Sequence, residues 1–275
     1  MTGPRHRPPA RGLAGWYARH GRHDLPWRAT RDRWSVLVSE VMLQQTQVGR
    51  AAGVWPAFMA RFPTPQTMAA AAPGDVIAAW GTLGYPRRAR RLWGAAGVVA
   101  ASGWPEDLAA LPGVGRYTAE AVAAQVDGHD AAAVETNVRR VVERRAGRVL
   151  SPREAAAASR EAGRPLTGRD RLLALMDVGA VLCRPRAPRC LECPLRRGCA
   201  TAAAIAAGGS SAVDPALGRR PRQPAYEGSF RQRRGRVLAQ LRAGPRPSAD
   251  LDPAALAALV EDGLAALDGL LARLP

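Results

Sequence analysis

The segment CRPRAPRCLECPLRRGC, residues 183–199, contains all four cysteines of this 275-residue chain. Gaps of six, two and five residues separate Cys183, Cys190, Cys193 and Cys199. Thiols gathered this closely indicate a metal or cluster site rather than disulfides, and four unrelated free thiols are the alternative. Zinc sites usually pair two short Cys-x-x-Cys knuckles, whereas this segment has one. The uneven spacing therefore favours a [4Fe-4S] cluster held by the four cysteines.

The charge of the chain indicates its partner. All 40 basic residues are arginine, and the formal net charge is +17. The resulting positive potential attracts a phosphate backbone, so nucleic acid is the expected partner. Because the sequence contains no lysine, no side chain can form a lysine Schiff base with an opened sugar.

The distribution of apolar residues along the sequence indicates where in the cell the protein is located. Residues 1–12 carry basic residues and prolines without the apolar core of a signal peptide. No uncharged run reaches the length that spans a membrane. We therefore expect a cytoplasmic, monomeric protein with no membrane partner, associated with the nucleoid if its source is a bacterium.

Helical patterns broken by glycine and proline extend from Trp16 to about Ala200, and they predict an all-α fold. Residues 208–224, GGSSAVDPALGRRPRQP, lack apolar periodicity and suit a linker. We expect a catalytic-size domain over 1–207, a linker over 208–228 and a small C-terminal unit over 229–275.

The C-terminal unit has the pattern of two helices and a final short element. A basic helix is closed by Gly244, and a second helix begins at Asp252-Pro253, an N-cap followed by a proline in the first turn. The Asp268-Gly269 pair predicts either a hairpin turn or a continuing helix. Helix, helix and hairpin would make a truncated winged-helix-like unit of DNA-binding type.

A second motif, LPGVGRYTAEAV at residues 111–122, has the form of a helix-hairpin-helix. Gly113 and Gly115 flank Val114, so the backbone can turn tightly and expose N–H groups at a helix N-terminus to a phosphate oxygen. Taken alone, such a turn could also be a plain connection between two helices.

The cysteine spacing, which follows ALMDVGAVLC, and this hairpin resemble the helix-hairpin-helix DNA glycosylases, the superfamily of endonuclease III and the MutY adenine glycosylases. The resemblance covers roughly residues 15–205. It implies a two-lobed all-α glycosylase fold with a [4Fe-4S] loop at 183–199, acting on double-stranded DNA. Members that also cut the backbone carry a lysine where this chain has Tyr117, so the resemblance implies a monofunctional enzyme. Tyr117 is then a candidate for stabilising the reacting sugar.

The segment DLPWRATRDRWSVLVSEVMLQQTQV, residues 24–48, carries the first candidate acid, Glu40. Apolar residues at helical spacing predict one buried helix face, formed by Trp34, Leu37, Val38, Val41, Met42 and Val48. Glu40 adjoins that face, where a salt bridge at a helix edge is the ordinary role. SEVMLQQTQV is similar to the MutY pattern, which implies that Glu40 protonates the flipped adenine. A glutamate of raised pKa among apolar neighbours keeps that proton near neutral pH.

The same resemblance assigns the residues that hold the extruded base and open the duplex. LPWR implies that Trp27 and Arg28 line the base pocket. Gln44, after EVML, and Tyr85, in GTLGYPRR, match residues that wedge into the duplex. A solvated helix position for Gln44 and a core position for Tyr85 are the alternatives.

The segment AVETNVRRV, residues 133–141, carries the second candidate acid. It is similar to the family pattern Asp-x-Asn-Val followed by two basic residues, with Glu135 in place of aspartate. Thr136 or Asn137 is the expected N-cap, and a carboxylate just before it should stay ionised. The resemblance implies that Glu135, with Asn137 in the same catalytic set, stabilises an oxocarbenium-like sugar electrostatically or by transient covalent capture. Glutamate is one methylene longer than the aspartate of the family pattern, and we expect this difference to affect the activity rather than the fold.

These patterns favour a glycosylase that removes adenine mispaired with 8-oxoguanine or guanine in base excision repair. A mismatch glycosylase for thymine or uracil opposite guanine, and a lesion-binding protein impaired at Glu135, are the alternatives. MutY enzymes usually append a NUDIX-like domain, and the residues after the linker are too few to form one.

Overall fold

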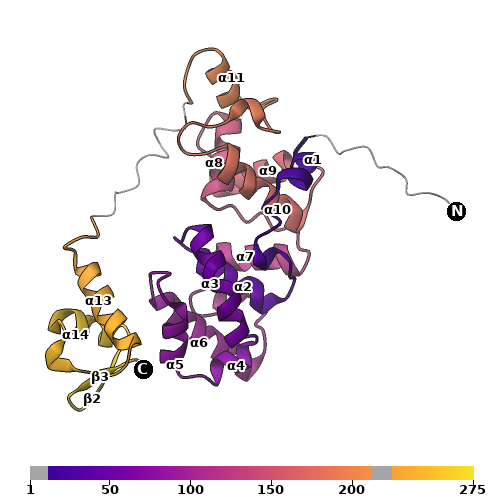
Figure 1. The fold of residues 1–275 in the computed structure, drawn as a ribbon. Helices are drawn as coiled ribbons and strands as arrows, with labels where there is room; N and C mark the ends of the chain where they lie inside the picture. The colour runs from indigo at the N-terminus through magenta and orange to yellow at the C-terminus, as the bar shows by residue number, and fades with distance from the viewer. Residues whose placement is uncertain (1–11, 212, 214–224) are drawn as a thin grey trace. The chain divides into compact units, whose positions relative to one another are not determined.

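Helices make up most of the described chain, as the sequence predicts. The computed structural model describes residues 12–211, 213 and 225–275 (Figure 1). The N-terminal extension, residues 1–11, and most of the predicted linker lie outside these residues. Within the described ranges, no helix combines the length and the apolar character needed to cross a membrane.

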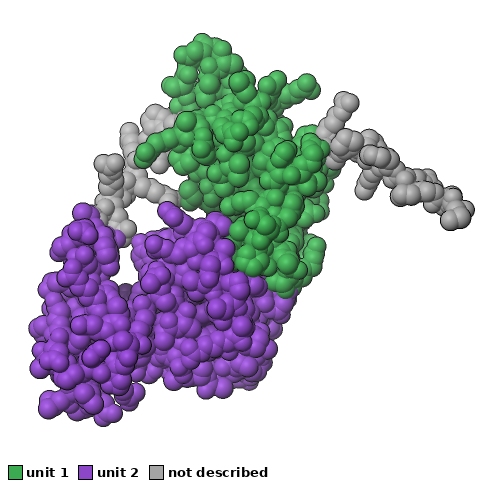
Figure 2. All heavy atoms as spheres, in the orientation of Figure 1, with its two compact units in different colours: residues 1–31, 120–221 green, residues 32–119, 222–275 purple. Residues whose placement is uncertain are grey.

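The chain forms two compact units, which Figure 2 colours green and purple. The first unit combines residues 1–31 with 120–221, and the second combines residues 32–119 with 222–275. The boundary at residue 120 falls inside α7, Arg116–Val126.

The helical part of the second unit is built around α6. Its elements are α2 (Arg33–Leu43), α3 (Val48–Arg61), α4 (Pro65–Ala69), α5 (Pro73–Trp80), α6 (Arg87–Ser102) and a 3-10 turn (Leu108–Ala110). Helix α6 packs against α2, α4 and α5. The large buried side chains of these helices include Trp34, Phe58, Met68, Ile77, Trp80 and Leu92. Burying each large apolar side chain contributes about 1.5–3 kcal/mol to the free energy of folding.

Local chemistry sets both ends of α2. Asp32 is its N-cap, and the carboxylate accepts a hydrogen bond from the Ser35 N–H at 2.7 Å, which satisfies a donor that the helix leaves unpaired. The helix ends at Leu43, and Gln45 then adopts a φ of +55°. Since a positive φ cannot continue a right-handed helix, the predicted helical face extending to Val48 is wrong, and Val48 begins α3.

Helix α8, Thr136–Ala146, is the centre of the first unit. It packs against α9 (Pro152–Ala162), α10 (Gly168–Asp177), a π-helical turn (Val178–Leu182) and α11 (Ala200–Ala206). Helix α1 (Gly12–His20) packs on α10 and is followed by a 3-10 turn (Pro26–Arg28). Gly179 allows the π-helical turn to approach α8, because a Cβ there would lie 2.6 Å from the Asn137 Cβ.

Asp177, the last residue of α10, is the centre of a buried ionic network. Its carboxylate accepts hydrogen bonds from both terminal nitrogens of Arg28, at 2.6 and 2.8 Å, and from the Arg22 N–H at 2.9 Å. The Asp177 and Arg28 side chains are 0% and 4% exposed. Burial acts to raise the pKa of Asp177, but the bonds and charges of Arg28 and Arg22 outweigh it and hold that pKa below its usual range.

We expect Asp177→Asn to lower the free energy of unfolding by about 3–5 kcal/mol, because the substitution leaves a buried arginine without its charged partner. Denaturant unfolding measures the loss. The matched control is Asp75→Asn, which breaks a half-exposed pair with Arg61 and should cost at most about 1 kcal/mol. Because the folded-state pKa of Asp177 is depressed, its contribution is present above the unfolded pKa of about 3.9 and disappears as pH falls through the folded value. Equal losses in the two variants would contradict this assignment.

The C-terminal part of the second unit has the predicted order of helix, helix and hairpin. Its elements are α13 (Phe230–Arg242), β1 (Arg246–Pro247), a 3-10 turn (Ser248–Asp250), α14 (Pro253–Glu261), β2 (Ala266–Asp268) and β3 (Leu271–Arg273). The sheet is antiparallel with strand order β1-β3-β2, and Ala272 pairs with both Arg246 and Leu267. The Asp268-Gly269 pair therefore forms a hairpin turn, the first of its two alternatives.

Candidate active site and cysteine pocket

Glu40 lies in the most deeply buried stretch of α2. Residues 36–42 are all buried, and Glu40 itself is 6% exposed. Removing a carboxylate from water disfavours its charged form. The role of Glu40 as a proton donor stays a prediction.

Gln44 and Tyr85 lie in the turns that follow α2 and precede α6. The Gln44 side-chain amide donates to the Gly113 carbonyl at 3.5 Å and to the Thr118 hydroxyl at 3.4 Å, so it faces the hairpin motif. Tyr85 is 43% exposed and has a φ of +48°, a strained conformation for an aromatic residue. Neither position matches its ordinary alternative, a solvated helix residue for Gln44 or a core residue for Tyr85.

The hairpin motif forms a tight turn before α7. The Val114 N–H donates to the Leu111 carbonyl at 3.1 Å, and Gly113 has a φ of +79°. A Cβ on Gly113 would also lie 2.9 Å from the Arg91 Cβ, whereas Gly115 faces open space. Tyr117 is half-buried in the first turn of α7.

Glu135 caps α8 with its own carboxylate. Oε1 accepts a hydrogen bond from the Val138 N–H at 2.9 Å, and Oε2 accepts one from Asn137 Nδ2 at 3.1 Å. The prediction of Thr136 or Asn137 as the N-cap is therefore wrong, because the longer glutamate side chain folds back over the first turn. Its negative charge then lies at the positive end of α8.

Arg140 links this end of α8 to the cysteine segment. Nη2 donates to Asn137 Oδ1 at 2.7 Å and to the Gly179 carbonyl at 2.6 Å, and Nε donates to the Cys183 carbonyl at 2.6 Å. The planar guanidinium suits several acceptors in fixed directions. The orientation of Asn137, and through it of Glu135, therefore depends on Arg140.

Trp27 and Arg28 belong to the 3-10 turn after α1; Trp27 is buried, and the side chain of Arg28 is 4% exposed. Asp177 binds the Arg28 guanidinium, as described above. Arg169 holds the backbone of this turn, since its terminal nitrogens donate to the Arg28 carbonyl at 2.6 Å and to the Thr30 carbonyl at 2.9 Å. The turn is thus fixed from two sides within the first unit.

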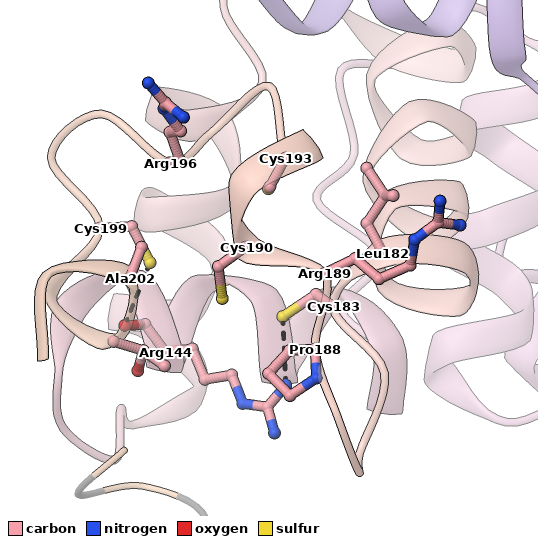
Figure 3. A pocket seen from close by; sticks show the side chains of 11 residues that line it. Arg144, Leu182, Cys183, Pro188, Arg189, Cys190, Cys193, Arg196, Cys199 and Ala202 are labelled. Carbon is pink, nitrogen blue, oxygen red and sulfur yellow. Dashed lines mark hydrogen bonds between the residues drawn. The ribbon is translucent and has the colours of Figure 1, made fainter. Parts of the chain in front are cut away.

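All four cysteines line one pocket of the first unit (Figure 3). In Figure 3 the sulfur atoms of Cys183, Cys190 and Cys199 point toward a shared space. The buried Arg144 lies beside them, with Nη1 2.7 Å from the Arg184 carbonyl and 3.4 Å from Cys183 Sγ. Cys199 Sγ donates to the Arg144 carbonyl at 3.6 Å. Helix α8 therefore anchors both ends of the cysteine segment.

The donor set of this pocket suits a cluster of several metal ions. Within the described ranges, no three His, Cys, Asp or Glu side chains converge closely enough to bind one metal ion. Four thiols around one pocket are the donor set that iron–sulfur clusters use. Burial raises the pKa of the Cys193 thiol to about 11.

The predicted residues fall into two groups. The second unit contains Glu40, Gln44, Tyr85, Tyr117 and the hairpin glycines, and the first unit contains Trp27, Arg28, Glu135, Asn137 and the cysteines. Sequence reasoning missed Arg88, Arg140 and Asp177, three buried charged residues. Arg88 and Arg140 each follow another arginine, and no charge pattern tells the buried member of such a pair from its neighbour.

Comparisons with known proteins agree with this architecture. Residues 38–164 match the family model of the HhH-GPD superfamily base excision DNA repair proteins. A thermostable thymine-DNA glycosylase superposes with a TM-score of 0.62 at 28% identity, over 70% of this chain and 93% of that chain. An endonuclease III in a non-covalent DNA complex, 22% identical, shares the fold with a TM-score of 0.58 over 68% of this chain and 90% of that chain. The family model and the shared fold thus indicate a helix-hairpin-helix protein of the base excision DNA repair class.

Relatives of similar sequence identify the family within this class of DNA repair proteins. The chain is 43% identical over 269 residues to the adenine DNA glycosylase of Mycobacterium tuberculosis, covering 92% of this chain and 85% of that protein. It is 36% identical over 208 residues to the human adenine DNA glycosylase, covering 68% of this chain and 38% of that protein. The chain belongs to the adenine DNA glycosylase family, which confirms the MutY-type resemblance.

Proposed function

We propose that this protein is a monofunctional DNA glycosylase that excises adenine paired with 8-oxoguanine or guanine in duplex DNA and leaves an abasic site. The observation that carries the proposal is the 43% identity to an adenine DNA glycosylase over 92% of this chain. The net charge of +17 supports binding to duplex DNA. Because the chain contains no lysine, it has no lysine-dependent strand cleavage.

Two carboxylates in contrasting environments divide the chemistry between them. Glu40, buried in α2, gives a proton to a ring nitrogen of adenine and makes the base a better leaving group. Glu135, which caps the N-terminus of α8, stabilises the cationic sugar that forms as the base departs. Tyr117 and Asn137 support the reacting centre, and water completes the reaction.

The remaining site residues bind and open the DNA. Trp27 and Arg28 form a rigid wall of the base pocket, supported by the contacts that fix their turn. Gln44 and Tyr85 enter the duplex near the lesion. Gly113, Val114 and Gly115 present backbone N–H groups to a phosphate. The glycosylase domain covers residues 1–207, and the C-terminal unit at 229–275 contacts the DNA backbone. The protein acts as a monomer in the cytoplasm.

The four cysteines hold a [4Fe-4S] cluster in this proposal. When bound, the cluster supplies a covalent cross-link for the arginine-rich segment 183–199. Arg145 supports that segment, since Nη1 donates to the Leu195 carbonyl at 3.0 Å and to the Arg197 carbonyl at 2.8 Å. The arginines between the cysteines then meet phosphate groups of the DNA.

We expect Cys199→Ser protein to contain less iron and sulfide per chain than wild-type protein and to show weaker visible absorption, because a hydroxyl replaces a thiolate ligand. Chemical quantification of iron and sulfide checks the expectation. Leu191→Ala is the matched control, since Leu191 lies in the same segment and is 82% exposed. Wild-type iron content in Cys199→Ser would contradict ligation by this cysteine.

A single-turnover assay tests the proposed activity on duplexes carrying adenine opposite 8-oxoguanine or guanine, and thymine or uracil opposite guanine. Strand scission in the adenine duplexes, and only after alkali, supports the proposal. Release of thymine or uracil would instead favour a mismatch glycosylase, the candidate to which the 28% identity with a thymine-DNA glycosylase points. Tight binding without base release from any duplex would overturn both and leave the lesion-binding alternative.

A further inference from the structure

Arg88 is a buried arginine that has no part in the proposed catalysis or DNA binding. It is the second residue of α6 and is 8% exposed. Burying a guanidinium is costly unless its N–H groups are hydrogen-bonded. Burial lowers the pKa of Arg88 to about 10, so the group stays charged at neutral pH. Its hydrogen-bond partners therefore indicate its purpose.

One terminal nitrogen of Arg88 closes the end of α2. Nη1 donates to the carbonyl oxygens of Val41 at 2.9 Å, Met42 at 3.0 Å and Gln44 at 2.5 Å. The last carbonyls of a helix have no N–H partner four residues further along the chain, although the Val41 carbonyl also accepts a hydrogen bond from the Gln44 N–H at 3.4 Å. Arg88 therefore caps the helix that carries Glu40 and fixes the backbone of Gln44.

The other terminal nitrogen holds the loop before α6. Nη2 donates to Thr46 Oγ1 and to the Gly84 carbonyl, both at 2.9 Å. The guanidinium carbon lies 5.5 Å from the Tyr85 ring centroid and 5.2 Å from that of Trp80. A strained backbone such as that of Tyr85 persists only where its surroundings over-determine it. Arg88 supplies such contacts, because it holds the backbone next to Tyr85 through the Gly84 carbonyl and also lies against the Tyr85 ring.

We infer that Arg88 is a positioning residue that holds Gln44 and Tyr85 in one fixed geometry for entering the duplex beside the extruded base. The inference rests on the proposed function, which gives these two residues their wedge role. A planar guanidinium reaches both turns at once, whereas a lysine ammonium is a single point charge with three donors. Releasing either turn displaces the wedge, and a misplacement of about 1 Å can cost about a hundredfold in rate.

Arg88→Lys tests this role, with Arg87→Lys as the matched control because Arg87 is the adjacent, exposed arginine of the same helix. Base extrusion is followed by the fluorescence of 2-aminopurine placed at the adenine position, and excision by single-turnover rates on adenine opposite 8-oxoguanine. We expect Arg88→Lys to lose most of the fluorescence rise and to slow excision by about ten- to a hundredfold. Arg87→Lys should stay within about twofold of wild type.

Two further variants separate positioning from general support of the fold. Thr46→Val removes one acceptor of Arg88 while keeping the side-chain shape, and should reduce the fluorescence rise to a smaller extent. In a double-mutant cycle, Gln44→Ala should cost less in the Arg88→Lys background than in wild type, because both residues act on the same step. A purely structural role would lower the melting temperature and give additive losses.

The outcomes distinguish this inference from the proposed function. A full fluorescence rise in Arg88→Lys, or additive losses in the cycle, would overturn the role of Arg88. Wild-type protein that extrudes 2-aminopurine but releases no adenine would overturn the proposed activity, while the fluorescence of the variants still decides the role of Arg88. Wild-type protein that produces no fluorescence rise would overturn the wedge and the inference together.

Discussion

Glu135→Gln should slow single-turnover excision of adenine by about a hundred- to a thousandfold, the usual cost of losing one preorganised electrostatic contact in an active site. The substitution keeps a carbonyl oxygen that can accept the Val138 N–H bond capping α8, but it removes the negative charge that opposes the cationic sugar. The folded structure and duplex affinity should therefore be preserved. Base release at enzyme excess measures the effect, and thermal unfolding confirms that the variant is folded.

Glu135→Asp is the matched control for this prediction. The glutamate carboxylate already folds back to 2.9 Å from the Val138 N–H, and aspartate is among the preferred N-cap residues. A shorter side chain can therefore place its carboxylate at the same N–H group, and we expect Glu135→Asp to stay within about tenfold of the wild-type rate. A loss as large as that of Glu135→Gln would show that the site needs the glutamate geometry. An undiminished rate in Glu135→Gln would remove Glu135 from the catalytic set.

The elements that sequence analysis predicts correctly have local causes. The hairpin at 111–115 depends on a glycine that adopts a φ of +79°, and α14 depends on Asp252, whose carboxylate accepts the Ala255 N–H at 2.8 Å. The cysteines gather because their spacing already places them in one segment. In each case the residues that cause the structure lie within a short stretch of chain, so their pattern is visible without the fold.

The buried charges could not be predicted in this way. Asp177 contacts Arg22 and Arg28 across separations of 155 and 149 residues, and the sequence gives no sign which of its many arginines the aspartate meets. Arg88 differs from Arg87 only in the side of α6 on which it lies, which the packing of α2 and α5 decides. The capping role of Glu135 likewise depends on a side-chain conformation, because the sequence favours shorter polar residues as caps.

Glu40→Gln should reduce adenine release by about a hundred- to ten-thousandfold, the range that a positioned general acid contributes. Glutamine is nearly isosteric with glutamic acid, so the packing around Val36, Leu37 and Met42, all fully buried, should be retained. It cannot give a proton to the ring nitrogen, and unprotonated adenine is a poor leaving group. Single-turnover base release measures the loss, and the affinity for the mispaired duplex shows that DNA binding persists.

A duplex carrying an N7-methylated purine at the same position discriminates the two acids. Such a base is already cationic and departs without receiving a proton, whereas the sugar still becomes cationic as it leaves. We therefore expect Glu40→Gln to recover most of its rate on this substrate, while Glu135→Gln stays impaired. Because one chemical change in the substrate rescues only one variant, the result separates proton donation from charge stabilisation. Equal impairment of Glu40→Gln on both bases would contradict the general-acid role and assign Glu40 to the positioning of the base.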